Sequence, residues 1–189
     1  AIDPLSIDDL TPLVRLFEDP KIVKVIHACS QDLEVLLYGM HCACAPVFDT
    51  QLAAAFLGMR QQASYASVVE HYMGVHLPKT ESLTDWSRRP LDSEQLVYAE
   101  DDVRYLPDIY RCMYERLMKT NRLGWLMPEM SAYTAPENFK RDPKEAYLHL
   151  KRSNSLTRRQ MALAREICAW REERAAQHNI PRKWIISDE

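Results

Sequence analysis

The chain has 189 residues, of which 47% are hydrophobic and 27% are charged, a balance typical of a folded globular protein rather than a disordered one. Its longest apolar run, residues 52–59, is far shorter than the roughly 18 residues of a membrane-spanning helix, so no membrane association of this kind is expected. The four glycines form neither a GxGxxG nor a GxxxxGK pattern, which argues against a nucleotide cofactor on a glycine-rich phosphate loop.

Charge is unevenly distributed along the chain, although the net charge is only −3. Residues 1–136 carry 12 Lys and Arg against 19 Asp and Glu, whereas residues 137–189 carry 12 against 8. An acidic first part and a basic second part fit a carboxylate metal site followed by a segment that contacts phosphates. They fit an ordinary charged surface equally well, so charge alone leaves both interpretations open.

The five cysteines are dispersed, with no CxxC pair, which indicates reduced thiols in a cytoplasmic protein rather than disulfides. His41, Cys42 and Cys44 do not have the spacing of a structural zinc site, and we interpret them as loop and core residues. The sequence opens without Met or a signal peptide, so we expect it to begin inside a longer protein.

Short β-branched strands alternate with helices in the first part of the chain, which favours an α/β fold with an at least partly parallel sheet. Two short strands do not make a stable sheet alone, so we expect further strands outside this sequence. In chain order the expected elements are a helix from residue 11, a strand at 22–26, a helix at 30–39, a strand at 47–48, a helix at 50–58 and a helix at 64–74.

The remainder of the chain is expected to be mainly helical. Apolar residues from Leu96 to Leu117 recur at spacings of three and four, which predicts one long helix from Ser93 with a continuous buried stripe, kinked at Pro107. An irregular linker is expected at residues 127–143. The expected elements beyond it are an amphipathic helix at 156–177, a break at 179–181 and the capped start of another helix at 187–189.

Two places in this arrangement are candidates for chemistry. Tyr98 and Asp102 are four residues apart on the long helix, so their side chains lie on one face at the edge of the apolar stripe. A tyrosine packed beside a surface acid is the alternative interpretation. Asp32 lies in the first turn of the helix that follows a strand, where loops often hold ligands; an acid that complements the helix dipole is the alternative there.

Five segments carry a more specific pattern: residues 2–5 (IDPL), 27–36 (HACSQDLEVL), 48–58 (FDTQLAAAFLG), 84–91 (TDWSRRPL) and 98–106 (YAEDDVRYL). In order and spacing they resemble the bacterial ribonuclease D family of DEDD 3′–5′ exonucleases, in its tyrosine subclass. Residues 27–36 resemble the second exonuclease motif and residues 98–106 resemble the third. The tail, with AWRE at 169–172 and NIP at 179–181, resembles the start of the HRDC helical module that follows the nuclease in this family.

The resemblance implies a ribonuclease H-like α/β fold, lacking its N-terminal strands here and followed by the start of an all-α HRDC domain. It divides the chain into an exonuclease part at residues 1–126, a linker at 127–154 and an HRDC part at 155–189. It also implies two-metal hydrolysis of phosphodiester bonds at the 3′ end of RNA, with tRNA precursors or other structured RNA ends as partners. A noncatalytic nucleic-acid-binding scaffold on a degenerate nuclease fold is the rival interpretation.

The same resemblance assigns roles to individual residues. Asp32 and Asp102 would be ligands of two divalent ions, Mg²⁺ or Mn²⁺, because such ions prefer oxygen ligands. Tyr98 would orient the attacking water, a role that suits a phenol with an ordinary pKa of about 10. Arg89 matches the family's arginine before Pro90, and Arg88 is an additional one.

The substrate contacts stay open between two interpretations. Arg88 and Arg89 are candidates for holding a phosphate and equally for solvated surface residues. His27 is a candidate for the pocket of the terminal nucleotide, and a histidine that caps a strand is the alternative. We interpret Trp86 as a core residue rather than a platform for base stacking.

One family motif has no counterpart in the chain. The first motif, an Asp-x-Glu on a strand, supplies the other two carboxylates and is expected to precede Ala1. The three local candidates do not replace it: Asp32 to Glu34 is expected to be helical, Asp92 to Glu94 resembles a capped helix start, and Asp49 is followed by Gln51 in place of Glu.

Overall fold

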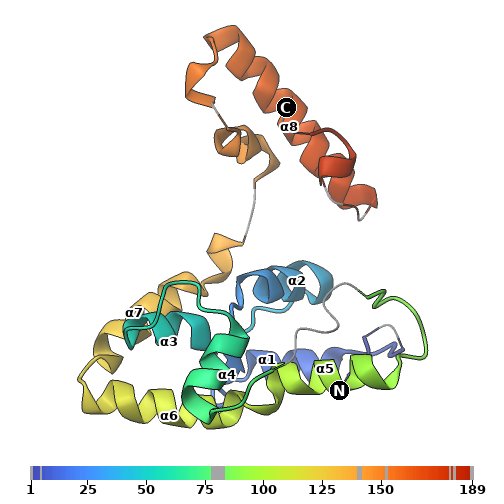
Figure 1. Ribbon diagram of the computed structural model, residues 1–189. Helices are drawn as coiled ribbons and strands as arrows, with labels where there is room; N and C mark the ends of the chain where they lie inside the picture. The colour runs from blue at the N-terminus through green and yellow to red at the C-terminus, as the bar shows by residue number, and fades with distance from the viewer. Residues whose placement is uncertain are drawn as a thin grey trace. The chain divides into compact units, whose positions relative to one another are not determined.

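The computed structural model divides into two units, Ala1–Phe139 and Lys140–Glu189, each of which is described by itself. In the first unit, helices surround two short strands (Figure 1). In the second unit, a long helix accompanies short 3-10 turns. The structure describes residues 2–4, 6–77, 84–139, 142–151, 153–178, 180 and 182–187.

The sheet of the first unit consists, in the described residues, of β1 (Lys24–Ile26) and β2 (Val47–Asp49). They pair in parallel, with Val25 opposite Phe48. Because parallel neighbours need a crossover, α2 (Ser30–Met40) connects them. The parallel α/β arrangement expected from the alternation of strands and helices is therefore confirmed.

Two hydrophobic clusters lie on opposite faces of β2, because successive strand residues point to opposite sides. Phe48 belongs to a cluster with residues of α3 (Thr50–Phe56), α4 (Tyr65–Met73), α6 (Leu106–Lys119) and α7 (Leu123–Tyr133). Val47 belongs to the other, with residues of α2 and partly buried residues of α1 (Thr11–Glu18). Cys42 and Cys44 are buried in this second cluster, which confirms that they are core residues.

The single long helix expected from Ser93 is instead two helices, α5 (Ser93–Arg104) and α6, which meet at Tyr105 and follow one another along the lower side of the first unit in Figure 1. Pro107 lies in the first turn of α6, where its missing N–H costs nothing, so the chain starts a new helix there instead of kinking one. The prediction of a continuous buried stripe is also wrong, because the side chains of Leu96 and Val103 on α5 are 49% and 57% exposed.

Residues 127–133, expected in an irregular linker, are also helical. They form the C-terminal part of α7, and Met130 packs in the core of the first unit. Its sulfur atom lies 3.2 Å from the backbone nitrogen of Asp49, which donates a hydrogen bond to it. This part of the chain therefore supports the strand that precedes α3.

The second unit contains α8 (Arg158–His178), which confirms the helix expected at residues 156–177, and the 3-10 turns η2 (Pro143–His149) and η4 (Arg182–Trp184). A cavity of about 310 Å³ lies between η2 and α8, and its lining includes no predicted site residue. The expected break at residues 179 and 181 and the helix start at 188–189 lie outside the described residues. None of the described helices is both long and apolar enough to cross a membrane.

Candidate active site

Helix α5 is anchored at its N-terminus by a capping box, as the sequence of residues 92–94 predicted. The Asp92 carboxylate accepts a hydrogen bond of 2.8 Å from the Gln95 backbone, and the Gln95 side chain accepts one of 3.1 Å from the Asp92 backbone. Gln95 is buried, and its amide group also donates to Thr84 Oγ1 and to the carbonyl of Asp85, both at 3.3 Å. The start of α5 is thereby tied to the loop at residues 84–90.

Tyr98 and Asp102 lie one helical turn apart on α5, as predicted. The pKa of Tyr98 is raised, first by desolvation and then by the negative charge of Asp102. The pKa of Asp102 is raised by desolvation and by its neighbour Asp101. Both shifts have partial burial as their first cause, and a neighbouring negative charge adds to each of them.

Asp102 differs from its acidic neighbours in having no cation beside it. Arg104 makes an ion pair of 2.7 Å with Glu100 and one of 3.6 Å with Asp101. The side chain of Asp102 is exposed to solvent, and it makes no hydrogen bond or ion pair with any described residue. An unneutralised, accessible carboxylate beside a tyrosine is suited to binding a cation.

Asp32 lies in the first turn of α2 and is likewise exposed and without an ion pair among the described residues. Its pKa is raised chiefly by desolvation, and the negative charge of Asp49 adds to the shift. The donor set of the two acids is therefore hard oxygen, which fits Mg²⁺ or Mn²⁺ in kind. Within the described ranges, no three His, Cys, Asp or Glu side chains gather into a metal-binding group.

Asp49 has a different role from Asp32, although both are acids near strand ends. It is 1% exposed and caps α3, where it accepts hydrogen bonds from the backbone of Gln51 and Leu52. Its carboxylate also accepts from the backbone of Ala28 at 3.2 Å and of Cys29 at 2.9 Å. Asp49 therefore holds the turn that leads into α2, and its oxygens are used internally.

His27 is held in the protein by both ring nitrogens. Nε2 lies 3.0 Å from the carbonyl oxygen of Ala63 and must donate to it, and Nδ1 lies 2.9 Å from Thr50 Oγ1. Desolvation lowers its pKa, although the charge of Asp49 opposes the shift. These contacts favour the interpretation that His27 caps the strand over the interpretation that it binds substrate.

Tyr65 is a residue that the sequence did not single out. Its ring lies 5.5 Å from that of His27, and its buried hydroxyl has no hydrogen-bond partner in the described part of the chain. Desolvation, with a contribution from the charge of Asp102, raises its pKa to about 12. Tyr65 thus packs beside His27 at the strand end, and the charge of Asp102 acts on its hydroxyl. Its position at the start of α4 gave no signal of this contact.

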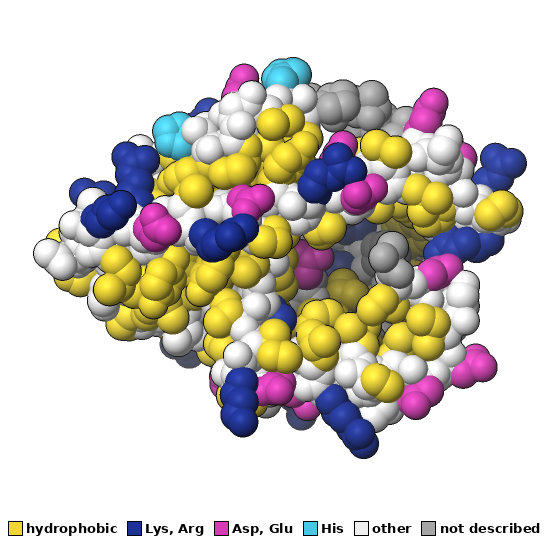
Figure 2. Space-filling view, turned by 90° about the horizontal axis from the view of Figure 1, so that it is seen from below, with side chains coloured by type: hydrophobic (Ala, Val, Ile, Leu, Met, Phe, Trp, Pro, Cys, Tyr) yellow, Lys and Arg dark blue, Asp and Glu magenta, His cyan; other side chains and the backbone are white. Residues whose placement is uncertain are grey.

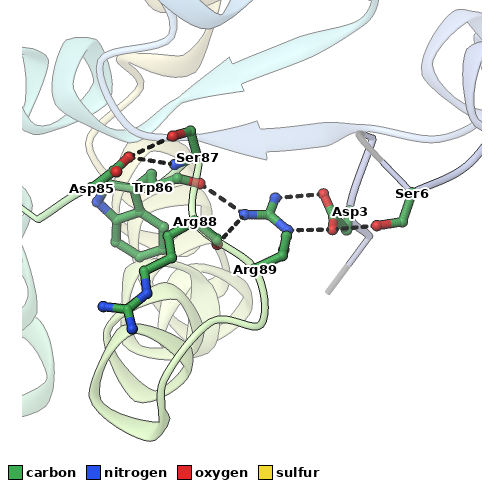
Figure 3. A network of polar contacts seen from close by, with 7 residues as sticks. All are labelled: Asp3, Ser6, Asp85, Trp86, Ser87, Arg88 and Arg89. Atoms are coloured by element: carbon green, nitrogen blue, oxygen red, sulfur yellow. Dashed lines mark hydrogen bonds and ion pairs between the residues drawn. The ribbon is translucent and has the colours of Figure 1, made fainter.

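The two arginines of the loop at residues 84–90 behave differently (Figure 3). Arg89 donates from Nε and Nη2 to the two carboxylate oxygens of Asp3, both at 2.7 Å. It also donates from Nη1 to the carbonyls of Trp86 and Arg88. The guanidinium of Arg88 points away from this network and makes no hydrogen bond or ion pair with a described residue.

Trp86, a residue of this loop, packs beside Tyr98 of α5. It is half-buried, and its ring centroid is 5.9 Å from that of Tyr98 at an angle of 50°. On the side of the first unit along which α5 and α6 run, a hollow opens among hydrophobic side chains, with acidic ones at its edge (Figure 2). The loop and α5 are thus joined by the contact between Trp86 and Tyr98. The loop carries Arg88 and α5 carries Asp102, neither of which has an ion pair among the described residues.

Comparisons with known proteins identify the family to which the chain belongs. A family model described as "3'-5' exonuclease" matches residues 1–118. A Ribonuclease D of Pseudomonas paraeruginosa is 43% identical over 187 residues, which cover 99% of this chain and 50% of that protein. The chain spans about half the length of the curated relatives that it matches.

Solved structures show the same likeness. The crystal structure of Escherichia coli RNase D, named there as an exoribonuclease involved in structured RNA processing, matches with a TM-score of 0.91 and 34% identity over 100% of this chain and 50% of that one. The catalytic core of RRP6 from Trypanosoma brucei matches with a TM-score of 0.64 and 28% identity, over 91% of this chain and 48% of that one. The ribonuclease H-like exonuclease fold expected from the motifs is thus confirmed.

Proposed function

Because the chain belongs to the 3′–5′ exonuclease family, we propose that the intact protein is an exoribonuclease of ribonuclease D type. It would shorten structured RNA from the 3′ end, with tRNA precursors as the expected substrates, in the cytoplasm. The observation that carries the proposal is Asp102: of the three consecutive acids on α5, it alone has no cation beside it, and it lies one turn from Tyr98.

In this proposal Asp32 and Asp102 hold divalent cations, Mg²⁺ or Mn²⁺, of which a complete site has two. Such ions, when bound, activate water and stabilise the leaving oxygen. Tyr98 positions the attacking water through its hydroxyl group. A phenol with an ordinary pKa of about 10 already keeps its proton at neutral pH, and the raised pKa of Tyr98 makes its ionisation still less favourable. The group therefore acts by hydrogen bonding rather than as a base.

Arg88 is the proposed phosphate contact of the loop, because its guanidinium has no protein partner among the described residues. A guanidinium that is free in this way can donate two parallel hydrogen bonds to a phosphate. His27 and Arg89 are less suited to substrate binding, since the protein already engages both ring nitrogens of His27 and four of the five N–H donors of Arg89. In terms of domains, residues 1–126 are the proposed exonuclease part, in the same unit as the rest of α7, and residues 155–189 are the proposed start of an HRDC domain.

The test is time-resolved degradation of a 5′-labelled, 3′-extended tRNA by the intact protein, with Mg²⁺ and with EDTA. The expected result is a ladder that shortens from the 3′ end only when the metal is present. Asp32→Asn protein, purified in the same way, controls for contaminating nucleases. Retained RNA binding without shortening would overturn the proposal in favour of the noncatalytic scaffold.

A further inference from the structure

The loop at residues 84–90 is attached to the N-terminal segment by one bidentate contact. Arg89 and Asp3 are 86 positions apart in the chain, and two parallel hydrogen bonds of 2.7 Å join their side chains. Ser6 Oγ donates to Asp3 Oδ2, also at 2.7 Å, which orients the carboxylate. Planar pairs of this kind are stronger and more directional than single ion contacts.

The same guanidinium also shapes the loop itself. Arg89 Nη1 donates to the carbonyl of Trp86 at 2.8 Å and to the carbonyl of Arg88 at 2.9 Å. Four of the five N–H donors of a guanidinium are therefore used by the protein. An incoming phosphate would have to displace the Asp3 carboxylate before it could be bound by the bidentate edge of Arg89.

What this arrangement holds in place is the side chain of Trp86. The backbone carbonyl of Trp86 accepts a hydrogen bond from Arg89, and the ring of Trp86 packs against Tyr98. The Asp85 carboxylate, which accepts from the backbone and the hydroxyl of Ser87, tightens the loop on the other side of Trp86 (Figure 3). The chain of contacts runs from Asp3 through Arg89 and Trp86 to the phenol on α5.

We infer that Asp3 and Arg89 form a positioning clamp, which holds Trp86 against Tyr98 and leaves Arg88 as the cation of the loop that meets the substrate. The inference rests on the proposed exonuclease function in one respect, namely the proposed role of Tyr98 in positioning the attacking water. The clamp itself is a feature of the loop and can be measured without any reaction. Arg89 is thus a positioning residue and not a phosphate ligand.

The test compares Asp3→Asn, Arg89→Ala and their double variant in the intact protein. Single-turnover cleavage of a 3′-extended RNA gives the rate, and fluorescence anisotropy without divalent metal gives RNA affinity. The clamp predicts a rate lowered about fivefold in each single variant, the size expected for one partly exposed ion pair, with unchanged RNA affinity. The double variant should be no slower than Arg89→Ala, because the two residues act as a unit.

The rival role, in which Arg89 is a phosphate ligand, predicts the opposite for Asp3→Asn. Loss of the Asp3 charge would then free Arg89 and tighten RNA binding, and Arg89→Ala would weaken it. Either result overturns the clamp. Arg88→Ala should instead weaken RNA binding and lower the slope of its salt dependence by about one. Asp108→Asn and Arg111→Ala break an exposed ion pair on α6 and are the matched controls, expected to change neither quantity.

Hydrogen exchange separates failure of the clamp from failure of the proposed function. Amides of residues 84–89 should exchange faster in Asp3→Asn and Arg89→Ala than in the wild type, whether or not the protein cleaves RNA. Unchanged exchange with an unchanged rate would disprove the clamp. Faster exchange in a protein that cleaves no RNA would leave the clamp intact and disprove the exonuclease.

Discussion

Helices α5 and α6 follow one another in the chain with the same apolar periodicity, yet they are used in different ways. Four residues of α6 are buried, namely Leu106, Ile109, Met113 and Leu117. In α5 only Gln95 is buried, and the apolar Leu96, Val97 and Val103 are at least 49% exposed. The helix that packs in the core therefore supports the fold, and the helix beside it carries Tyr98 and Asp102.

The difference teaches that a stripe of apolar residues predicts a helix but does not predict what covers the stripe. α6 lies against α3, α4 and β1, whereas α5 is held chiefly at its first turn, through the capping box and the contacts of Gln95. A carboxylate on such a helix keeps access to solvent and to cations. The same carboxylate on the buried face of α6 would need a partner inside the core.

The largest expected effect is the loss of cleavage when an acid of α5 is replaced and the fold of the helix is kept. Asp102→Asn should lower the cleavage rate by about 10³-fold or more, because metal-assisted charge stabilisation is worth several kcal/mol. Asp101→Asn is the matched control, since Asp101 is paired with Arg104, and should cleave at nearly the wild-type rate. Equal rates for Asp102→Asn and the wild type in a gel-based assay would contradict the assignment.

The second prediction contrasts the two helices in stability. Leu117→Ala removes a fully buried side chain of α6 and should lower the free energy of unfolding by about 2 to 5 kcal/mol. Leu96→Ala on α5 makes the same chemical change at an exposed position and should alter it by less than about 0.5 kcal/mol. Denaturant unfolding of both variants measures the difference, and equal losses would show that the face of α5 is covered in solution.

The smallest expected effect is the pH dependence of stability that His27, at the end of β1, contributes. Because the pKa of His27 is lowered, the unfolded chain binds a proton at a higher pH than the folded one. The stability contributed by neutral His27 is therefore present above its ordinary pKa of 6.5 and is lost as the pH falls toward the lowered value.

The stability difference between the wild type and His27→Gln should accordingly shrink between pH 7.5 and pH 5.5, as followed by urea unfolding. His76→Gln changes an exposed histidine that lies 3.7 Å from Glu70 and serves as the control, with no such trend expected. A difference that stays constant over this range would show that His27 does not titrate as the geometry requires.

Much of the candidate site could be predicted from local spacing. Tyr98 and Asp102 share a helix face because residues four apart always do. Asp32 follows a strand because the hydrophobic pattern marks the strand and the helix start on either side of it. The choice between Arg88 and Arg89 could not be predicted, because it depends on Asp3, which only the folded chain brings to the loop.

The sequence by itself thus determined the alternation of strands and helices in the first part, the motifs of the family and the acids that lie beside a tyrosine on one helix. These depend on propensity and on the fixed geometry of a few consecutive residues. The sequence did not determine the division of residues 93–119 into two helices or the helix at residues 127–133. Only the tertiary structure decided which helix is buried, that both nitrogens of His27 are engaged, and that Arg89 is bound to Asp3. Those outcomes depend on contacts between residues far apart in the chain, and no local pattern specifies which distant side chain will meet them.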